Sequence, residues 1–157
     1  MTDRVLKGGS AIMLDVDSAA MPAPYDNNSG HHCTLQFVGR NLPIYYAAGL
    51  IAAATRILPM PLRATGACRR FATTKGSYLV LEIERTEELR TVREYLRGQL
   101  TSAGIRWRDD FDWSPHVTLA EAPPGTAFAL PEPVAPFDVK CTHVTCKLGD
   151  QRIRFEL

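Results

Sequence analysis

Two short stretches of the sequence share the pattern His-x-Thr-Leu, and both carry side chains that can move protons. They are HCTL at residues 32–35 and HVTL at residues 116–119. In an extended chain residues i and i+2 point the same way, so each stretch predicts a strand with its His and Thr on one face. The unperturbed pKa of an imidazole is about 6.5, so histidine suits acid-base catalysis close to neutral pH.

The surroundings of the first motif predict two distinct strand faces. Alternation in HHCTLQFVG (31–39) indicates an apolar face of Cys33, Leu35 and Phe37. It indicates a polar face of His32, Thr34 and Gln36. His31 is expected to be a solvated neighbour of the reactive ring.

Two such strands, one from each half of the chain, predict a shared site on opposite walls of one cleft. One imidazole would take a proton from a nucleophile while the other gives one to the leaving group. The threonine hydroxyls would donate hydrogen bonds to an oxyanion as its charge grows. A phosphodiester fits this layout best, because oxygens on both sides of its phosphorus need protons moved.

Composition favours one soluble globular domain over residues 1–157. Apolar residues make up 45% of the 157 residues and charged residues 22%. The formal net charge of +1 argues against a long nucleic acid as the main partner and favours a small nucleotide. The start MTDRVLKGGS has no apolar secretory core, so we expect a cytoplasmic protein with reduced cysteines, and GLIAAA (49–54) is too short to cross a membrane.

Hydrophobic periodicity and turn residues predict an α+β fold with mostly antiparallel strands. One helix is expected to begin at Asn41 and end before the PMP triplet at 59–61. A second is expected from the N-cap Thr86 to Gly104, with an apolar stripe that includes Leu89 and Leu96. The expected strands are 10–16, 31–38, 62–72, 77–85, 114–122, 137–148 and 151–157.

The paired motifs resemble those of the 2H phosphoesterase superfamily, whose members carry one H-x-T/S-hydrophobic motif in each of two lobes. The resemblance includes the Phe and Gly after the first motif and Pro115 before the second. It implies a two-lobed α+β fold of pseudo-twofold antiparallel sheets, with helices on the outer faces and a central cleft. It also implies that His32 and His116 are the acid-base pair and that Thr34 and Thr118 hold the phosphate.

The same resemblance implies a metal-independent phosphodiesterase that needs no cofactor and works as a monomer. Its substrate would be a small nucleotide with a 2′-linked or cyclic phosphodiester: a cyclic oligonucleotide signal, a 2′-5′ oligonucleotide or a 2′,3′-cyclic phosphate. Some viral members of the superfamily degrade the cyclic nucleotide signals of host immunity, and a short stand-alone domain is compatible with that anti-defence role. Alternatives are a 2′,3′-cyclic phosphodiesterase or 2′-5′ RNA ligase acting on RNA ends, and a non-catalytic nucleotide-binding module.

Several cationic and aromatic residues are candidates for contacts to the substrate. Tyr25 precedes the first motif and Trp113 the second, so both rings are positioned to stack on a base. Guanidinium groups suit phosphate, although a single arginine is more often a solvated surface residue. The arginine candidates are Arg40, Arg69, Arg70, Arg106 and Arg108, of which we select Arg40, Arg70 and Arg108.

A third His-x-Thr, His143-Val144-Thr145, complicates the pattern. Cys146 stands where the other two copies have leucine, so we interpret this copy as coincidence or as a neighbour of the cleft. Cys141, His143 and Cys146 raise the question of zinc. Three candidate ligands along one strand cannot converge on a single ion, so no metal site is expected.

Overall fold

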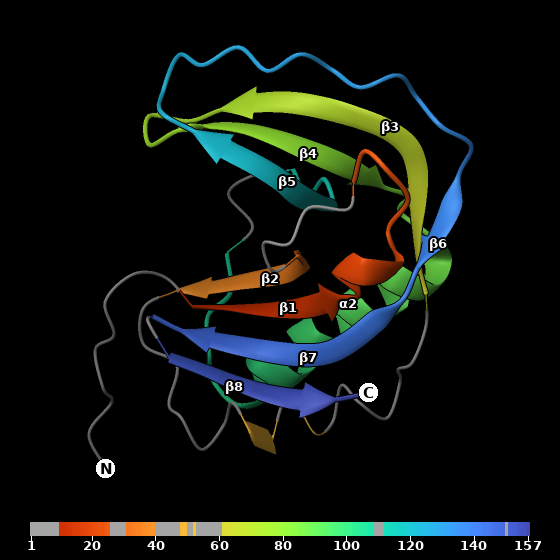
Figure 1. Ribbon diagram of the computed structural model, residues 1–157. Helices are drawn as coiled ribbons and strands as arrows, with labels where there is room; N and C mark the ends of the chain where they lie inside the picture. The colour runs from red at the N-terminus through yellow and green to blue at the C-terminus, as the bar shows by residue number, and fades with distance from the viewer. Residues whose placement is uncertain are drawn as a thin grey trace.

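The computed structural model describes residues 10–25, 31–39, 48–49, 52, 61–108, 112–149 and 151–157. Eight strands form one sheet in the order β6-β3-β4-β5-β2-β1-β7-β8, and every pairing described is antiparallel. Figure 1 shows that the sheet divides into an upper half with β3, β4 and β5 and a lower half with β2, β1, β7 and β8. The strands are β1 (Ser10–Val16), β2 (His32–Gly39), β3 (Leu62–Ala72), β4 (Ser77–Ile83), β5 (His116–Ala122), β6 (Phe137–Val139), β7 (Cys141–Leu148) and β8 (Gln151–Glu156).

One long helix, α2 (Glu87–Ser102), covers one face of the sheet, and a short 3-10 helix (Ser18–Ala20) follows β1. Thr86 caps α2 by accepting a hydrogen bond from the Leu89 amide at 3.1 Å. The buried stripe of the helix packs with alternate residues of β1 into one apolar core. Each fully buried leucine or valine stabilises the fold by about 1.5–3 kcal/mol. The stripe consists of Leu89, Val92, Leu96 and Leu100.

The predicted α+β class and the two-lobed antiparallel architecture are confirmed. The strands at 10–16 and 62–72 have the predicted bounds, and Thr86 caps the second helix as expected. The helix expected after Asn41 lies mostly outside the described residues; of that segment the structure describes residues 48–49 and 52, which are helical. The two lobes are halves of one continuous sheet.

The single strand predicted at 137–148 is wrong, because the chain changes partners in the middle of it. β6 pairs with β3 in the upper half, and β7 pairs with β1 in the lower half. Lys140 lies between them, and its carbonyl accepts a hydrogen bond from the Asp17 amide at 2.9 Å. At Lys140 the chain therefore crosses from β6, at the outer edge of the upper half, to β7 in the lower half.

The four cysteines are free thiols, as expected for reduced cysteines. Three are buried, and burial raises the pKa of Cys33 to about 12 and of Cys141 to about 11. These thiols are therefore protonated at neutral pH. None of the helices in the described ranges combines the length and the apolar character needed to cross a bilayer.

Gly66 allows a close backbone approach that no other residue would allow. It has φ of 89°, and a Cβ there would collide with the carbonyl oxygen of Val134. Its own carbonyl accepts hydrogen bonds from the Tyr25 hydroxyl at 3.0 Å and from the Val134 amide at 2.9 Å. Gly66 thus joins β3 to two segments that are far apart in the sequence.

We predict that Gly66→Ala lowers the free energy of unfolding by about 2–4 kcal/mol, through the collision and the left-handed backbone. Gly98→Ala is the matched control, because Gly98 lies inside α2 with open space around its Cα. Alanine there should raise the free energy of unfolding by about 0.5–1 kcal/mol. Urea unfolding of both variants measures the difference, and equal effects would contradict this account of Gly66.

Candidate active site

The two His-x-Thr strands are neighbours in the sheet, and a single residue pair joins them. Cys33 of β2 lies opposite Val117 of β5. Because the strands are antiparallel, this register sets His32 opposite Thr118 and Thr34 opposite His116. Side chains that face one another across a strand pair are close neighbours, and the charge of His116 acts on His32 across this junction. The four side chains therefore form one cluster on one face, at the junction of the two halves.

His116 is held in one orientation by the residues just before it. Its Nδ1 lies 2.8 Å from the Ser114 carbonyl oxygen, which can only accept, so Nδ1 carries the proton and Nε2 is left for chemistry. The Ser114 hydroxyl accepts a hydrogen bond from Arg69 at 2.7 Å. Burial lowers the pKa of His116; the hydrogen bond to Ser114 opposes this, and the charge of Arg69 adds to it.

Two aromatic rings extend the site above His116. The Phe71 ring meets the His116 ring edge-on, with 5.4 Å between centroids. Tyr78 stacks on Phe71 at 4.8 Å with an interplanar angle of 20°. Both rings are half-buried, so they form a partly open aromatic surface beside the second motif.

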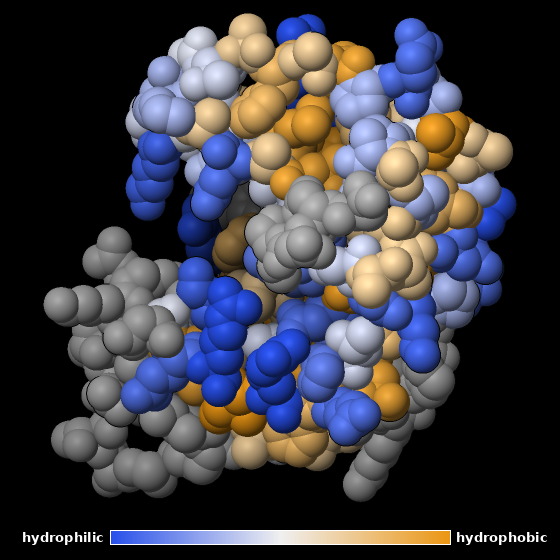
Figure 2. All heavy atoms as spheres, in the orientation of Figure 1, coloured by the Kyte–Doolittle hydropathy of each residue, from blue (hydrophilic) through white to orange (hydrophobic). Residues whose placement is uncertain are grey.

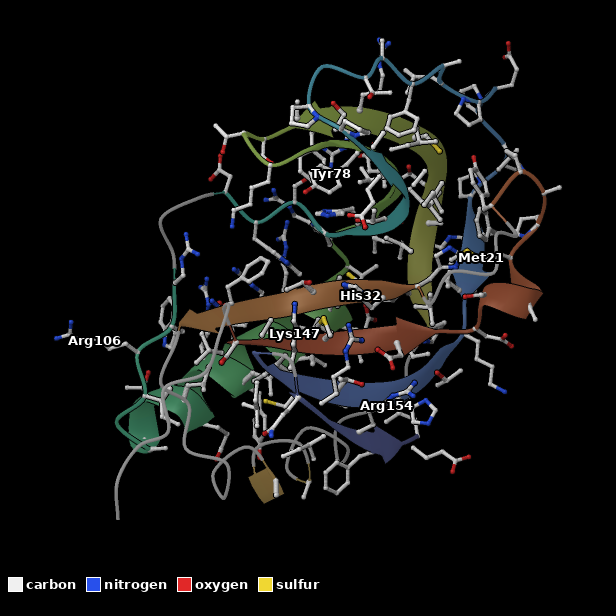
Figure 3. All side chains as sticks on the ribbon, turned by 60° about the vertical axis from the view of Figure 1, so that its left-hand side comes forward. Met21, His32, Tyr78, Arg106, Lys147 and Arg154 are labelled. Atoms are coloured by element: carbon white, nitrogen blue, oxygen red, sulfur yellow. The ribbon has the colours of Figure 1, made fainter. Side chains whose placement is uncertain are left out.

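His32 faces a row of charged residues on the lower half of the sheet. Asp15 lies directly opposite His32, and its carboxylate accepts hydrogen bonds from Thr145 at 3.1 Å and from Arg154 at 2.6 and 3.0 Å. In Figure 3, His32, Lys147 and Arg154 lie on the same side of the lower half, with Tyr78 in the upper half above them. The His32 ring therefore lies beside a fixed carboxylate and a group of cations.

Burial is the main cause that lowers the pKa of His32. The charge of Asp15 opposes this shift, whereas the charges of Arg152, Lys147 and His116 add to it. His116 acts on His32 because both rings lie on the same face of the junction between β2 and β5. A phosphodiester bound between these groups would bring negative charge and raise the pKa of both rings.

A β-bulge reverses the predicted faces of β2 after Thr34. Thr34 lies opposite Met13 and Gln36 opposite Ile12, so Leu35 is an extra residue in β2. Gln36 therefore turns to the helix side, where it accepts a hydrogen bond from Arg97 of α2 at 2.9 Å and donates to the Arg108 carbonyl at 2.7 Å. The polar face predicted for Gln36 is wrong.

Phe37 moves to the opposite face for the same reason. It lies opposite Ala11, on the side of His32 and Thr34, and is 40% exposed. Its predicted place on the buried apolar face is therefore wrong as well. Without the bulge, Gln36 would lie on the face of His32 and Phe37 on the buried face, as predicted.

The two aromatic candidates differ in their surroundings. Tyr25 has no exposed surface; its hydroxyl donates to Gly66 and its ring stacks on Phe137 with 5.9 Å between centroids. The structure thus places Tyr25 in the core, where its ring is closed off from a ligand at the surface. Trp113 lies beside the first motif on the α2 side of the sheet, where its Nε1 donates to the Thr34 carbonyl at 3.2 Å and the Arg93 guanidinium covers one ring face at 4.3 Å.

The structure places the arginine candidates in different surroundings. Arg40 lies outside the described residues. Arg70 points away from His116 and donates to the Phe128 carbonyl at 3.1 Å, whereas its neighbour Arg69 reaches the site. Arg108 is exposed, and its amide donates to the Phe37 carbonyl at 3.0 Å. In Figure 3, Arg106 projects away from His32.

The sequence prediction missed the charged residues of β1, β7 and β8. The sequence contained a signal for these residues: polar and apolar residues alternate in CTHVTCKL and QRIRFEL, which predicts a polar face on each strand. Only the strand order shows that these polar faces continue the face of His32. The missed residues are Asp15, Lys147, Arg152 and Arg154, with Phe71 and Tyr78 in the upper half.

The third His-x-Thr belongs to the same face, two strands from His32. His143 lies opposite Asp15, and its Nδ1 is 2.9 Å from the Thr142 hydroxyl. Cys141 and Cys146 belong to the core on the other face, so the three side chains do not converge on one point. His31 is 3% exposed, so the prediction that it is solvated is wrong. Burial lowers the pKa of its imidazole.

The site opens into a recess between the two halves of the sheet. Figure 2 shows this recess, with hydrophilic side chains on both rims. A cavity of about 400 Å³ leads to His32 from the lower half. It is lined by Asp15, Val16, Ser18, His31, His32, Thr142, Arg152 and Arg154.

Comparison with known structures gives the same architecture. A structure described as a phosphoesterase superposes with a TM-score of 0.57 at 18% identity and covers 95% of each chain. E. coli LigT complexed with 3′-AMP gives a TM-score of 0.54 at 17% identity over 96% of each chain. LigT complexed with phosphate gives 0.51 at 16% identity, over 99% of this chain and 96% of LigT. These similarities show that the chain has the same fold as the phosphoesterase and LigT structures.

Sequence comparison gives the family. A search of curated protein sequences found no match. The family model of the 2′-5′ RNA ligase superfamily, in contrast, matches residues 21–146, a span that includes both His-x-Thr motifs. Together with the shared fold, this match shows that the chain belongs to the 2′-5′ RNA ligase superfamily, the 2H phosphoesterases.

Proposed function

We propose that this protein is a 2H-type phosphodiesterase that opens a 2′-linked or cyclic phosphodiester in a nucleotide. The observation that carries the proposal is the register of β2 and β5, which sets two imidazoles and two threonine hydroxyls in one cluster. Membership of the 2′-5′ RNA ligase superfamily supports phosphodiesterase or ligase-type chemistry at this cluster.

In the proposed reaction a water oxygen forms a bond to phosphorus as the bond from phosphorus to the ribose oxygen breaks. One of His32 and His116 takes the proton of the water, and the other gives a proton to the departing oxygen. Thr34 and Thr118 donate hydrogen bonds to the phosphoryl oxygens, where negative charge grows. No step in this scheme needs a metal ion.

The charges and rings around the cluster support a nucleotide substrate. Lys147, Arg152 and Arg69 provide cations on both sides of the two histidines. Phe71 and Tyr78 form a stacked pair against His116 and offer a surface for a base. LigT has been crystallised with 3′-AMP and with ATP, so a relative with this fold holds nucleotides.

The choice among nucleotides remains part of the proposal. Candidates are RNA ends or mononucleotides with a 2′,3′-cyclic phosphate, 2′-5′ oligonucleotides and cyclic oligonucleotide signals, the last implying an anti-defence role. The ligase direction runs the same proton transfers in reverse. A module that only binds nucleotides would have no need of two proton-transfer groups, which favours an enzyme.

We predict that His32→Ala and His116→Ala each lower kcat/KM by about a hundredfold or more, because each removes one proton-transfer group. His143→Ala is the control: His143 shares the face but lies opposite Asp15, and we expect a loss below about tenfold. A panel of the candidate nucleotides, assayed with EDTA present, measures these effects. Activity that survives both substitutions, or that EDTA abolishes, would show the mechanism to be wrong.

The lowered pKa values of both histidines predict an acidic pH optimum for kcat/KM. Burial disfavours each imidazolium, so the ring that must be neutral and the ring that must be protonated both titrate below their ordinary range. The bell-shaped profile should therefore peak below about pH 6.5. The kcat profile should lie at higher pH, because the bound phosphodiester stabilises both imidazoliums. A kcat/KM maximum above pH 8 would contradict this prediction.

Arg69 and Arg70 offer a matched pair of substitutions on one strand. Arg69→Gln should lower kcat/KM by about tenfold or more, because it removes the cation beside His116 and the donor to Ser114. Arg70→Gln should change it less than about threefold, since Arg70 contacts Phe128 on the other face. Steady-state kinetics on the best substrate measures both, and a larger effect at Arg70 would refute the assignment of faces.

A further inference from the structure

Four titratable side chains form a cross-strand row on the lower half of the sheet. His32 of β2 lies opposite Asp15 of β1, Asp15 lies opposite His143 of β7, and His143 lies opposite Glu156 of β8. Residues opposite one another in antiparallel strands point to the same face. Asp15 therefore lies between two imidazoles, of which only His32 belongs to the cluster of two histidines and two threonines.

Asp15 is a buried carboxylate that neighbouring strands hold in place. It is 7% exposed. Its Oδ2 accepts one hydrogen bond from the Thr145 hydroxyl at 3.1 Å and two from the Arg154 guanidinium at 2.6 and 3.0 Å. All three bonds end on Oδ2, so Oδ1 keeps its capacity to accept a hydrogen bond from a protonated nitrogen.

Thr145 gives the third His-x-Thr motif a structural role. Its side chain has no exposed surface, and its hydroxyl donates to Asp15. Thr34 and Thr118 of the first two motifs are half-buried instead, so their hydroxyls can meet a ligand. The hydroxyl of the third motif therefore holds a carboxylate in place and cannot itself reach a substrate.

The two imidazoles of the cluster have different neighbours. Ser114 holds the His116 ring through a hydrogen bond, and the nearby charge is the cation Arg69. Within the described residues no hydrogen bond holds the His32 ring, and its partner across the strand pair is the anion Asp15.

Asp15 has a distinct electrostatic effect among the groups around His32. Burial lowers the pKa of His32, and of the described residues Asp15 is the one whose charge raises it. The other charged or titratable groups on this face are His116 of β5, His143 and Lys147 of β7, and Arg152 and Arg154 of β8. When protonated, each of these groups disfavours a second positive charge on His32.

Stability alone does not account for a carboxylate at this position. A buried ion pair is often no more stabilising than apolar residues of the same volume, because both charges lose water. A carboxylate beside a histidine, in contrast, fixes the orientation of the ring and stabilises its imidazolium form.

We propose that Asp15 is a positioning residue for His32, which orients the ring and favours its protonated form, and that Thr145 and Arg154 fix Asp15 for this role. The inference rests on the proposed function for its effect on the reaction rate. Its effect on the His32 ring itself is measurable without turnover.

Asp15→Asn and Arg154→Gln should move the titration of His32 in opposite directions. The asparagine amide removes the negative charge but still accepts a hydrogen bond from Thr145, so His32 should titrate at lower pH than in the wild type. Arg154→Gln removes the cation that partly neutralises Asp15, so His32 should titrate at higher pH. Loosened packing would expose the ring and move both titrations upward, so opposite shifts separate charge from packing. Proton–carbon correlation NMR, with His32 assigned from His32→Ala, measures the titrations.

Glu156→Gln is the matched control. It removes the same charge from the same row, but Glu156 is exposed and faces His143. The titration of His32 should stay as in the wild type. The proposal is overturned if Asp15→Asn shifts His32 no more than this control does, or if Asp15→Asn and Arg154→Gln shift it in the same direction. If Asp15→Asn does not fold, an unchanged or lower titration in Arg154→Gln overturns it.

Kinetics on the best substrate tests the consequence for the reaction. Asp15→Asn should lower kcat/KM at neutral pH by about tenfold, and one limb of the bell-shaped profile should move to lower pH further than the other. Glu156→Gln should keep kcat/KM within about twofold. A loss in Asp15→Asn with an unshifted profile would show a merely structural role and overturn the proposal. A wild type without phosphodiesterase activity would refute the proposed function, while the NMR titration would still decide whether Asp15 acts on His32.

Discussion

The site depends on one backbone pairing, that of Cys33 with Val117, where the two halves of the sheet meet. Both residues are fully buried, so their side chains anchor the core on one face. The residues on either side of each must then point to the other face, and this brings His32 beside Thr118 and Thr34 beside His116. A register slip of one residue would turn one His-Thr pair into the core, so the apolar core fixes how the two His-Thr pairs face each other.

Beyond that pair the two strands separate, and two side chains and one backbone amide supply the hydrogen bonds that a neighbouring strand would otherwise make. Trp113 donates to the Thr34 carbonyl and Arg93 to the Leu35 carbonyl, while the Arg108 amide donates to Phe37. Buried carbonyls without partners would be costly, so these donors allow the sheet to open without exposing unsatisfied backbone. The opening leaves a recess on the face that carries the two histidines.

The sequence predicted much of the site because its signals are local. The paired His-x-Thr-Leu motifs, the cap at Thr86 and the bounds of several strands each follow from a few adjacent residues. Arg69 could also have been chosen over Arg70, since Cys68 packs against the core and alternation sets its neighbour on the opposite face. The faces of Gln36 and Phe37 could not be predicted, because a bulge at Leu35 depends on pairing with β1.

By itself, then, the sequence determined the α+β class, the two His-x-Thr strands and the family resemblance, all of which rest on short-range periodicity and spacing. Tertiary structure decided which charges surround His32, because Asp15, Lys147 and Arg154 reach it only through the strand order β2-β1-β7-β8. It also decided where Tyr25 and Trp113 lie, one in the core and one at the junction. Pairing between distant strands carries no local signal, so only the folded sheet could reveal it.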